Sequence, residues 1–210
     1  MEERAQLYRE AIRGADAVRV KYDITGPRLG LQQMRAIYRD QKIELTYWPH
    51  KLKVLRGVYI NDEDEASVMV DGSLPDDPKL FTLAHELKHH LIDHQACSTI
   101  EGDLEAREIA AEVFAAHLLL PEVLFTQGLE ERGIVRGVSS DDEVRAAIID
   151  FKLDSRTTLS FTGLAKRAER LGYASARGAL LDTKWKKLRD EMYGDKYYIR
   201  SHRALSSTHH

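Results

Sequence analysis

Cysteine is almost absent from the 210-residue chain, in which Cys97 is the only one. A single cysteine excludes an intrachain disulfide, and nothing else points to an oxidising compartment. The sequence also lacks an apolar run near the roughly 20 residues that cross a bilayer. The charged start Met1-Glu2-Glu3-Arg4 has none of the apolar stretch of a secretion signal. We therefore expect a cytoplasmic protein without a membrane partner.

Neither sign of charge dominates the chain, whose formal net charge is −3. This balance excludes binding of polyanions by the bulk electrostatics of the whole molecule. Residues 156–203 depart from it, because they hold twelve Lys or Arg against five Asp or Glu. Hydrophobic residues make up 43% of the chain and charged residues 31%, a balance typical of globular proteins with a packed core.

Hydrophobic periodicity predicts an α+β fold. Alternating segments rich in Val, Ile or Tyr predict a small antiparallel sheet with strands near residues 43–48, 55–60 and 66–70. Apolar residues at helical spacing predict a helix from Leu80 to about Asp93. A second, unusually apolar helix is predicted at 104–120, where Pro121 ends it. Shorter helices are predicted at both ends of the chain, and the C-terminal part is mainly helical, with Ser139 or Ser140 capping one helix and Ser160 the next.

The clearest chemical pattern is His85-Glu86-Leu87-Lys88-His89, an HExxH segment on the first of these two long helices. At a spacing of four residues both imidazoles project from one face, one turn apart, and reach the same metal ion. Glu86 is placed to accept a proton from a water molecule whose pKa the metal lowers. Taken alone, the pattern is equally compatible with a helix that carries two surface histidines.

A catalytic zinc site needs a third protein ligand and keeps a fourth position open. On the apolar helix that follows, Glu108 and Glu112 stand one turn apart on one face. Burial of two carboxylates without a partner is costly, and a metal ion with its histidines supplies one. We assign Glu108 as the third ligand and Glu112 as an acceptor that orients a ligand histidine. The alternative for both is an exposed acidic stripe. Further histidines are weaker candidates, namely His50, His90, His94 and His117.

Two segments together carry a specific signature. They are Leu80-Phe-Thr-Leu-Ala-His-Glu-Leu-Lys-His89 and Glu108-Ile-Ala-Ala-Glu-Val-Phe-Ala-Ala-His-Leu-Leu-Leu-Pro121. The pair resembles the ImmA/IrrE metallopeptidases, whose pattern is an FTLAHELGH helix and a later E-x-E-A-N-x-F-A-A-x-L-L-M-P helix. The likeness extends over roughly residues 30–173. The sequence departs from the pattern at three positions, with Lys88 for the usual Gly, Ala110 for a second Glu, and Glu112 for Asn or Asp.

The resemblance implies a gluzincin-like metalloendopeptidase in which Glu86 is the general base and Glu108 the third ligand of zinc. Two histidines and one carboxylate accept several divalent ions, so Mn²⁺ is the alternative to Zn²⁺. The implied substrate is a helix-turn-helix repressor, whose cleavage relieves repression of stress-response or mobile-element genes. Enzymes of this kind generally add a donor to the oxyanion, and the unranked candidates are Tyr47, Tyr59, Tyr197 and Tyr198.

The resemblance and the pattern of elements together predict three regions. Residues 1–126 form a zincin-like metallopeptidase domain, and residues 127–185 a helical, helix-turn-helix-like region. Residues 186–210 form a C-terminal tail whose last two histidines are typical of a purification-tag remnant.

The main alternative is a metal-stabilised regulator that binds DNA or a partner and hydrolyses nothing. It is favoured by the basic residues after Arg156 and by the predicted helix Ser160–Gly172, which fits the second helix of a helix-turn-helix. Glu86 argues against it, since a purely structural metal site does not need a base beside its ligands. Direct binding of nucleic acid is compatible with either reading.

Overall fold

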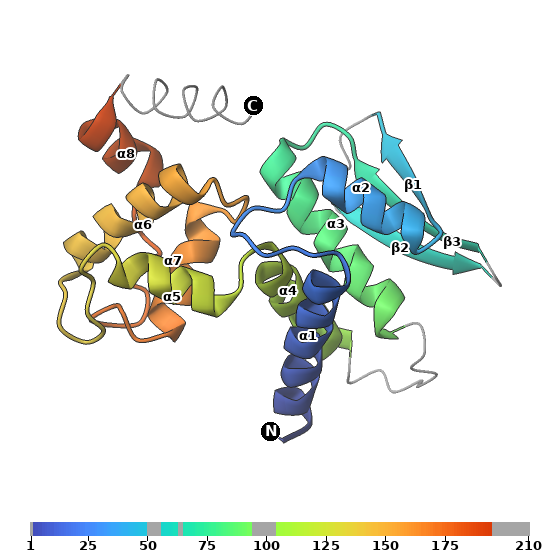
Figure 1. Cartoon of the computed structure of the whole chain (residues 1–210), viewed down its shortest axis with the longest axis horizontal. Helices are drawn as coiled ribbons and strands as arrows, with labels where there is room; N and C mark the ends of the chain where they lie inside the picture. Colours follow the sequence, from blue (N-terminus) through green and yellow to red (C-terminus); the bar gives the residue numbers. More distant parts are fainter. Residues whose placement is uncertain (1, 50–55, 63–64, 94–103, 195–210) are drawn as a thin grey trace. The chain divides into compact units, whose positions relative to one another are not determined.

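The chain divides at Pro121 into two units, Met1–Pro121 and Glu122–His210. The computed structural model describes residues 2–49, 56–62, 65–93 and 104–194 (Figure 1). Over these residues the first unit holds four helices and a three-stranded sheet, and the second holds four helices. The predicted α+β class is confirmed. The roles predicted for residues 1–126, 127–185 and 186–210 stay predictions.

The sheet consists of β1 (Ile43–Trp48), β2 (Gly57–Asp62) and β3 (Glu65–Asp71), in the order β1-β3-β2. β2 and β3 are antiparallel, but β1 and β3 are parallel, so the prediction of a wholly antiparallel sheet is wrong for β1. The reason is the strand order. Successive strands alternate in direction, and β3 inserts between the other two, so that β1 meets the strand that runs its own way.

Two helices, α2 (Leu31–Asp40) and α3 (Asp76–Leu91), pack against the strands and against each other. α4 (Leu104–Leu119) packs on α3, and α1 (Glu2–Lys21) packs on α4, as Figure 1 shows. Fully buried side chains from all these layers form one core, among them Ala15, Met34, Val68, Leu83 and Phe114. This core fixes α3 against α4, which is the arrangement that the candidate site depends on.

A buried arginine ties α1 to the end of α4. Arg19 is 6% exposed, and its guanidinium donates to the carbonyl of Leu118 at 2.7 Å and to that of Gly26 at 2.6 Å. Leu118 lies in the last turn of α4, where backbone carbonyls have no partner within the helix. Burial lowers the pKa of Arg19, and the charge of Asp16 opposes that effect.

The apolar character of α4 raises the question of a membrane span. Among the described residues, no single helix is long and apolar enough to cross a bilayer. In the part of the chain that the structure describes, α4 and α5 (Glu122–Glu130) pass this test of length and composition only when they are taken together. α4 buries much of its apolar surface, including Ala110, Ala111 and Phe114.

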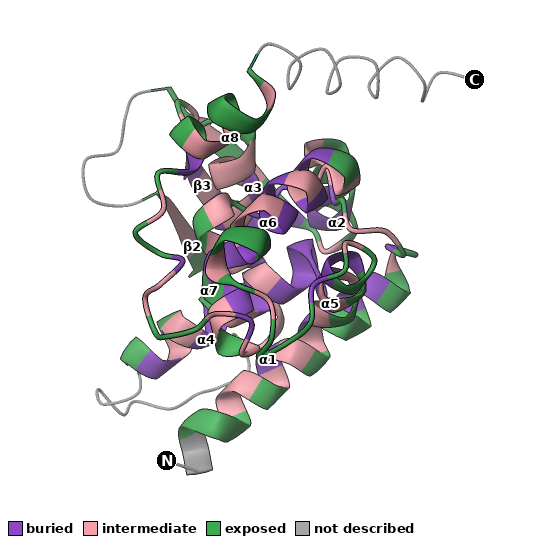
Figure 2. Ribbon diagram, turned by 90° about the vertical axis from the view of Figure 1, so that its left-hand side faces the viewer, coloured by how far each residue is buried: buried purple, intermediate pink, exposed green. Residues whose placement is uncertain are grey.

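The second unit consists of α5, α6 (Asp141–Ser155), α7 (Phe161–Arg170) and α8 (Trp185–Tyr193). The predicted caps are confirmed, since Ser140 caps α6 and Ser160 caps α7. Figure 2 shows buried residues along α6, whereas residues 4–6 of α1 are exposed. α5 begins at Glu122, directly after the proline at which the sequence predicts the end of the preceding helix.

Candidate metal centre

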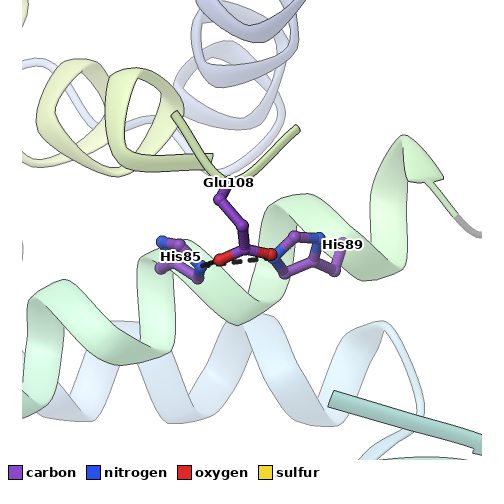
Figure 3. Close-up of side chains that lie close together, drawn as sticks. All are labelled: His85, His89 and Glu108. Atoms are coloured by element: carbon purple, nitrogen blue, oxygen red, sulfur yellow. Dashed lines mark hydrogen bonds and ion pairs between the residues drawn. The ribbon is translucent and has the colours of Figure 1, made fainter. Parts of the chain in front are cut away.

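Three side chains from two helices meet at one point in the first unit. His85 and His89 project from α3, and Glu108 reaches between them from α4 (Figure 3). Nε2 of His85 lies 3.2 Å from Oε2 of Glu108 and 3.2 Å from Nε2 of His89. Nε2 of His89 lies 3.4 Å from Oε1 of Glu108. Residues 23 positions apart along the chain thus present one ligand atom each to a common centre.

These separations fit a metal ion. A tetrahedral ion with ligand bonds of roughly 2.0–2.1 Å keeps its ligand atoms about 3.3–3.4 Å apart. The donor set of two imidazoles and one carboxylate is also one that catalytic zinc uses. The side chains of His85 and His89 are 18% and 16% exposed, whereas that of Glu108 is 61% exposed. The centre is therefore accessible to solvent on the side of α4 that carries Glu108.

Electrostatics keep His85 in the form that binds metals. Burial lowers its pKa, and the charge of His89 lowers it further, while Glu108 acts in the opposite direction. A lowered pKa favours the neutral imidazole at neutral pH. The neutral ring has the free nitrogen lone pair that a metal ligand must offer.

Glu86 lies between α3 and β2 and is 6% exposed. Burial raises the pKa of its carboxyl to about 7, with Glu108 adding to the effect and His89 opposing it. The backbone N–H of Tyr59 on β2 donates a hydrogen bond to this carboxylate. A Cβ atom on Gly57 would lie 3.0 Å from Oε1 of Glu86, so the glycine leaves the space that this side chain occupies. The arrangement offers a proton acceptor beside the centre.

Asp93 is a residue of this region that the sequence analysis missed. Its Oδ2 lies 2.6 Å from Nδ1 of His89, and both its oxygens accept from Nζ of Lys88, at 2.7 and 2.8 Å. The spacing of four residues after His89 was the available signal. It was hidden because Asp93 stands at the end of the predicted helix, where acidic residues are usually solvent-exposed.

The role predicted for Glu112 stays a prediction. Its side chain is exposed on α4, and its charge raises the pKa of His85. Over the described ranges it makes no hydrogen bond or ion pair with either ligand histidine. A carboxylate that contacts a histidine of the centre through Nδ1 is supplied instead by Asp93.

The other histidines and tyrosines lie in separate contacts. His90 meets the hydroxyl of Tyr59 at 3.2 Å, and His117 meets Asp16 at 2.9 Å. The hydroxyl of Tyr47 accepts from Arg35. The remaining candidates lie outside the described residues, namely His50, His94, Tyr197 and Tyr198.

An HExxH helix that gathers two histidines, a neighbouring glutamate and a carboxylate from a second helix defines the class of the metallopeptidases. Residues 39–154 match the peptidase family M78, described as the IrrE N-terminal-like domain. The match covers more than half of the chain, and the chain belongs to this family. The resemblance to the ImmA/IrrE metallopeptidases is thereby confirmed. No curated protein matches the chain.

Proposed function

We propose that the chain is a zinc-dependent metalloendopeptidase of the gluzincin type, with His85, His89 and Glu108 as metal ligands and Glu86 as general base. The observation that carries the proposal is the meeting of the three ligand atoms within 4.8 Å of one another, beside a buried carboxyl. Family membership supports the peptidase activity. The ligand set supports zinc, with manganese as the alternative.

The proposed reaction is hydrolysis of an amide bond. When bound, the metal supplies a Lewis acid that lowers the pKa of a water molecule and polarises the scissile carbonyl. Glu86 takes a proton from this water as the new C–O bond forms. It then gives the proton to the leaving nitrogen as the C–N bond breaks. Burial raises the pKa of the Glu86 carboxyl, which makes it a better proton acceptor than a solvent-exposed glutamate.

We further propose that the substrate is a protein, a helix-turn-helix transcriptional repressor, cut at one site so that repression of stress-response or mobile-element genes is relieved. Support comes from the resemblance to the ImmA/IrrE proteins. The accessible side of the centre, at Glu108, is the side from which a protein segment would approach the ligands.

The direct test mixes the zinc-loaded protein with the repressor encoded beside its gene and reads the products by intact mass. A Glu86→Gln variant serves as the control, because it keeps all three proposed ligands. We expect a single cut with the wild type and none with the variant. A wild type that binds the repressor but leaves it intact with zinc and with manganese overturns the peptidase assignment.

The alternative function, a DNA-binding regulator, depends on the basic C-terminal residues. On α7, Arg167 is buried and Arg170 pairs with Glu122, so that Lys166 is the exposed cation of this helix outside that pair. This arrangement weakens α7 as a recognition helix. A gel shift with random duplex across a salt series tests the alternative, since phosphate contacts give a steep salt dependence.

A further inference from the structure

We propose that Asp93 orients the ligand His89 and that Lys88 holds Asp93 in position, so that these two residues form a supporting layer of the metal centre. Both would then be positioning residues that act on the metal through His89. The inference rests on the proposed metal-binding function. Neither the HExxH spacing nor the match to the family model assigns a role to Lys88 or Asp93.

The contact between Asp93 and His89 sets the direction of the imidazole. A carboxylate 2.6 Å from Nδ1 accepts a hydrogen bond from the protonated Nδ1. This tautomer leaves the lone pair on Nε2. Nε2 is the atom that lies 3.2 Å from His85 and 3.4 Å from Glu108. Asp93 therefore selects the form of His89 that faces the centre, as partners of metal-ligating histidines commonly do.

Lys88 fixes Asp93 from the other side. Its side chain is 2% exposed, and Nζ donates to both oxygens of Asp93 and, at 3.3 Å, to the carbonyl of Arg107 on α4. A lysine ammonium has three donors, and these three acceptors use them all. The carbonyl of Arg107 directly precedes Glu108 in the chain. Lys88 thus links Asp93, the hydrogen-bond acceptor of ligand His89, to the backbone beside ligand Glu108.

The burial of Lys88 also excludes a direct role of this residue in contacting the substrate. An ammonium that is 2% exposed does not reach a substrate or an oxyanion in the solvent-accessible part of the site. A plain structural ion pair at the end of α3 is the competing explanation. It predicts a loss of stability on mutation, but it gives no reason for the 2.6 Å contact with His89 and predicts no change in metal affinity.

The sequence offers a second reason to connect Lys88 with Asp93. Lys88 stands where the ImmA/IrrE pattern usually has glycine, which has no side chain. This chain therefore holds Asp93 by a contact that a protein with the usual glycine could not make. The layer would be a feature of this chain rather than of the HExxH helix in general.

The test compares two variants that both lack the buried ammonium of Lys88 and differ only at Asp93. Lys88→Met keeps most of the length of the side chain without the ammonium, and Lys88→Met/Asp93→Asn also neutralises the carboxylate. Neither variant leaves an unpaired buried ammonium, which a single Asp93→Asn change would. Circular dichroism of the metal-free proteins confirms that both are folded. The affinity for zinc is then measured by competition with a chelating dye, without any substrate.

We expect the double variant to bind zinc roughly 10- to 100-fold more weakly than Lys88→Met. We also expect the visible spectrum of bound Co²⁺ to differ between the two, because the angle of one ligand ring changes. Asp16→Asn is the matched control, since it neutralises an aspartate that contacts a histidine at 2.9 Å outside the centre, and it should leave zinc affinity unchanged.

Equal zinc affinity in Lys88→Met and in the double variant overturns the role of Asp93. Equal affinity in Lys88→Met and the wild type overturns the role of Lys88. Failure of the proposed function looks different, because a wild type that binds no zinc or manganese fails before any variant is compared. Metal binding without cleavage leaves the inference standing while the peptidase assignment falls.

Discussion

At the scale of single residues, the space around Glu86 depends on Gly57, which has no Cβ atom. A Cβ on Gly57 would come within 2.5 Å of Cγ2 of Thr82 and 3.0 Å of Oε1 of Glu86. Thr82 lies one turn before Glu86 on α3, and its hydroxyl donates to the carbonyl of Pro78. Because β2 approaches α3 this closely, the backbone N–H of Tyr59 reaches the carboxylate. The position of the proposed base is thus set by a strand as well as by its own helix.

We expect Gly57→Ala to reduce cleavage while it leaves metal binding intact. The added methyl group must displace Thr82 or Glu86, and a displacement of about 1 Å at a reacting group costs roughly 100-fold in rate. Steady-state kinetics on the cleaved substrate should show the loss in kcat, with the zinc affinity measured on the same protein. A variant with wild-type kcat would mean that Glu86 does not need the position seen here.

At the scale of the secondary structure elements, the packing of α5 on α6 also depends on a glycine. The Cβ position of Gly128 on α5 lies 2.3 Å from Cδ2 and Cε2 of the Phe151 ring on α6. Phe151 is 4% exposed and packs edge-on against Phe125 at 5.5 Å. The ring has little space to move away, so the two helices approach at a point where one side chain is absent.

Gly128→Ala should therefore destabilise the protein, although alanine favours a helix. The gain in helix propensity is about 1 kcal/mol, and overpacking of a filled core typically costs about 1–3 kcal/mol. Urea unfolding followed by circular dichroism measures the net change. Gly26→Ala is the control, because a Cβ there meets nothing within 4 Å. A Gly128→Ala protein as stable as the control would show that Phe151 repacks freely.

At the start of α6, Asp141 should make the stability of the protein depend on pH. Oδ1 and Oδ2 of Asp141 accept from the backbone N–H and the hydroxyl of Ser175, and these bonds lower the pKa of the carboxyl. A lowered folded-state pKa gives stability that is present above the unfolded value of 3.8 and is lost as pH falls through the folded value. Asp141→Asn should thus lose less stability than the wild type on acidification below about pH 4. Urea midpoints at pH 3 to 6 test this, and parallel pH curves for the two proteins contradict it.

Local patterns predicted most elements but not their arrangement. The caps at Ser140 and Ser160 were predictable because a cap bonds to residues three positions away. The parallel pairing of β1 with β3 was not, since alternation identifies a strand without its neighbour. α5 was missed because Pro121 marks the end of one helix and says nothing about the next. In the site, the spacing of His85 and His89 is local, whereas the contact of Lys88 with Asp93 depends on how a side chain turns once it is buried.

At the scale of the whole molecule, all three proposed ligands lie in the unit Met1–Pro121. They come from α3 and α4, which pack on each other and supply many side chains of the core of that unit. An ion bound to both helices would oppose their separation during unfolding. The stabilising effect of the metal should therefore act on the first unit.

We expect zinc to raise the melting temperature of the protein and a chelator to reverse the increase. At a free zinc concentration 100 times Kd, the free energy of unfolding increases by about 2.7 kcal/mol for one site that is absent from the unfolded chain. Differential scanning calorimetry with and without zinc measures it, and His85→Ala should abolish the shift. An unchanged melting temperature in saturating zinc would show that this ion does not bind the folded protein preferentially.

The burial of Lys88 also makes its amine a natural reporter of local opening. Reagents that modify lysines need a free, accessible amine, and the ammonium of Lys88 is 2% exposed and bonded to three acceptors. Exposed lysines such as Lys166 should react at once. Lys88 should react only when the end of α3 separates from α4, so its rate of labelling, read by peptide mass spectrometry, counts those openings. A bound metal ion would then be visible as a slower reaction at a lysine that never touches it.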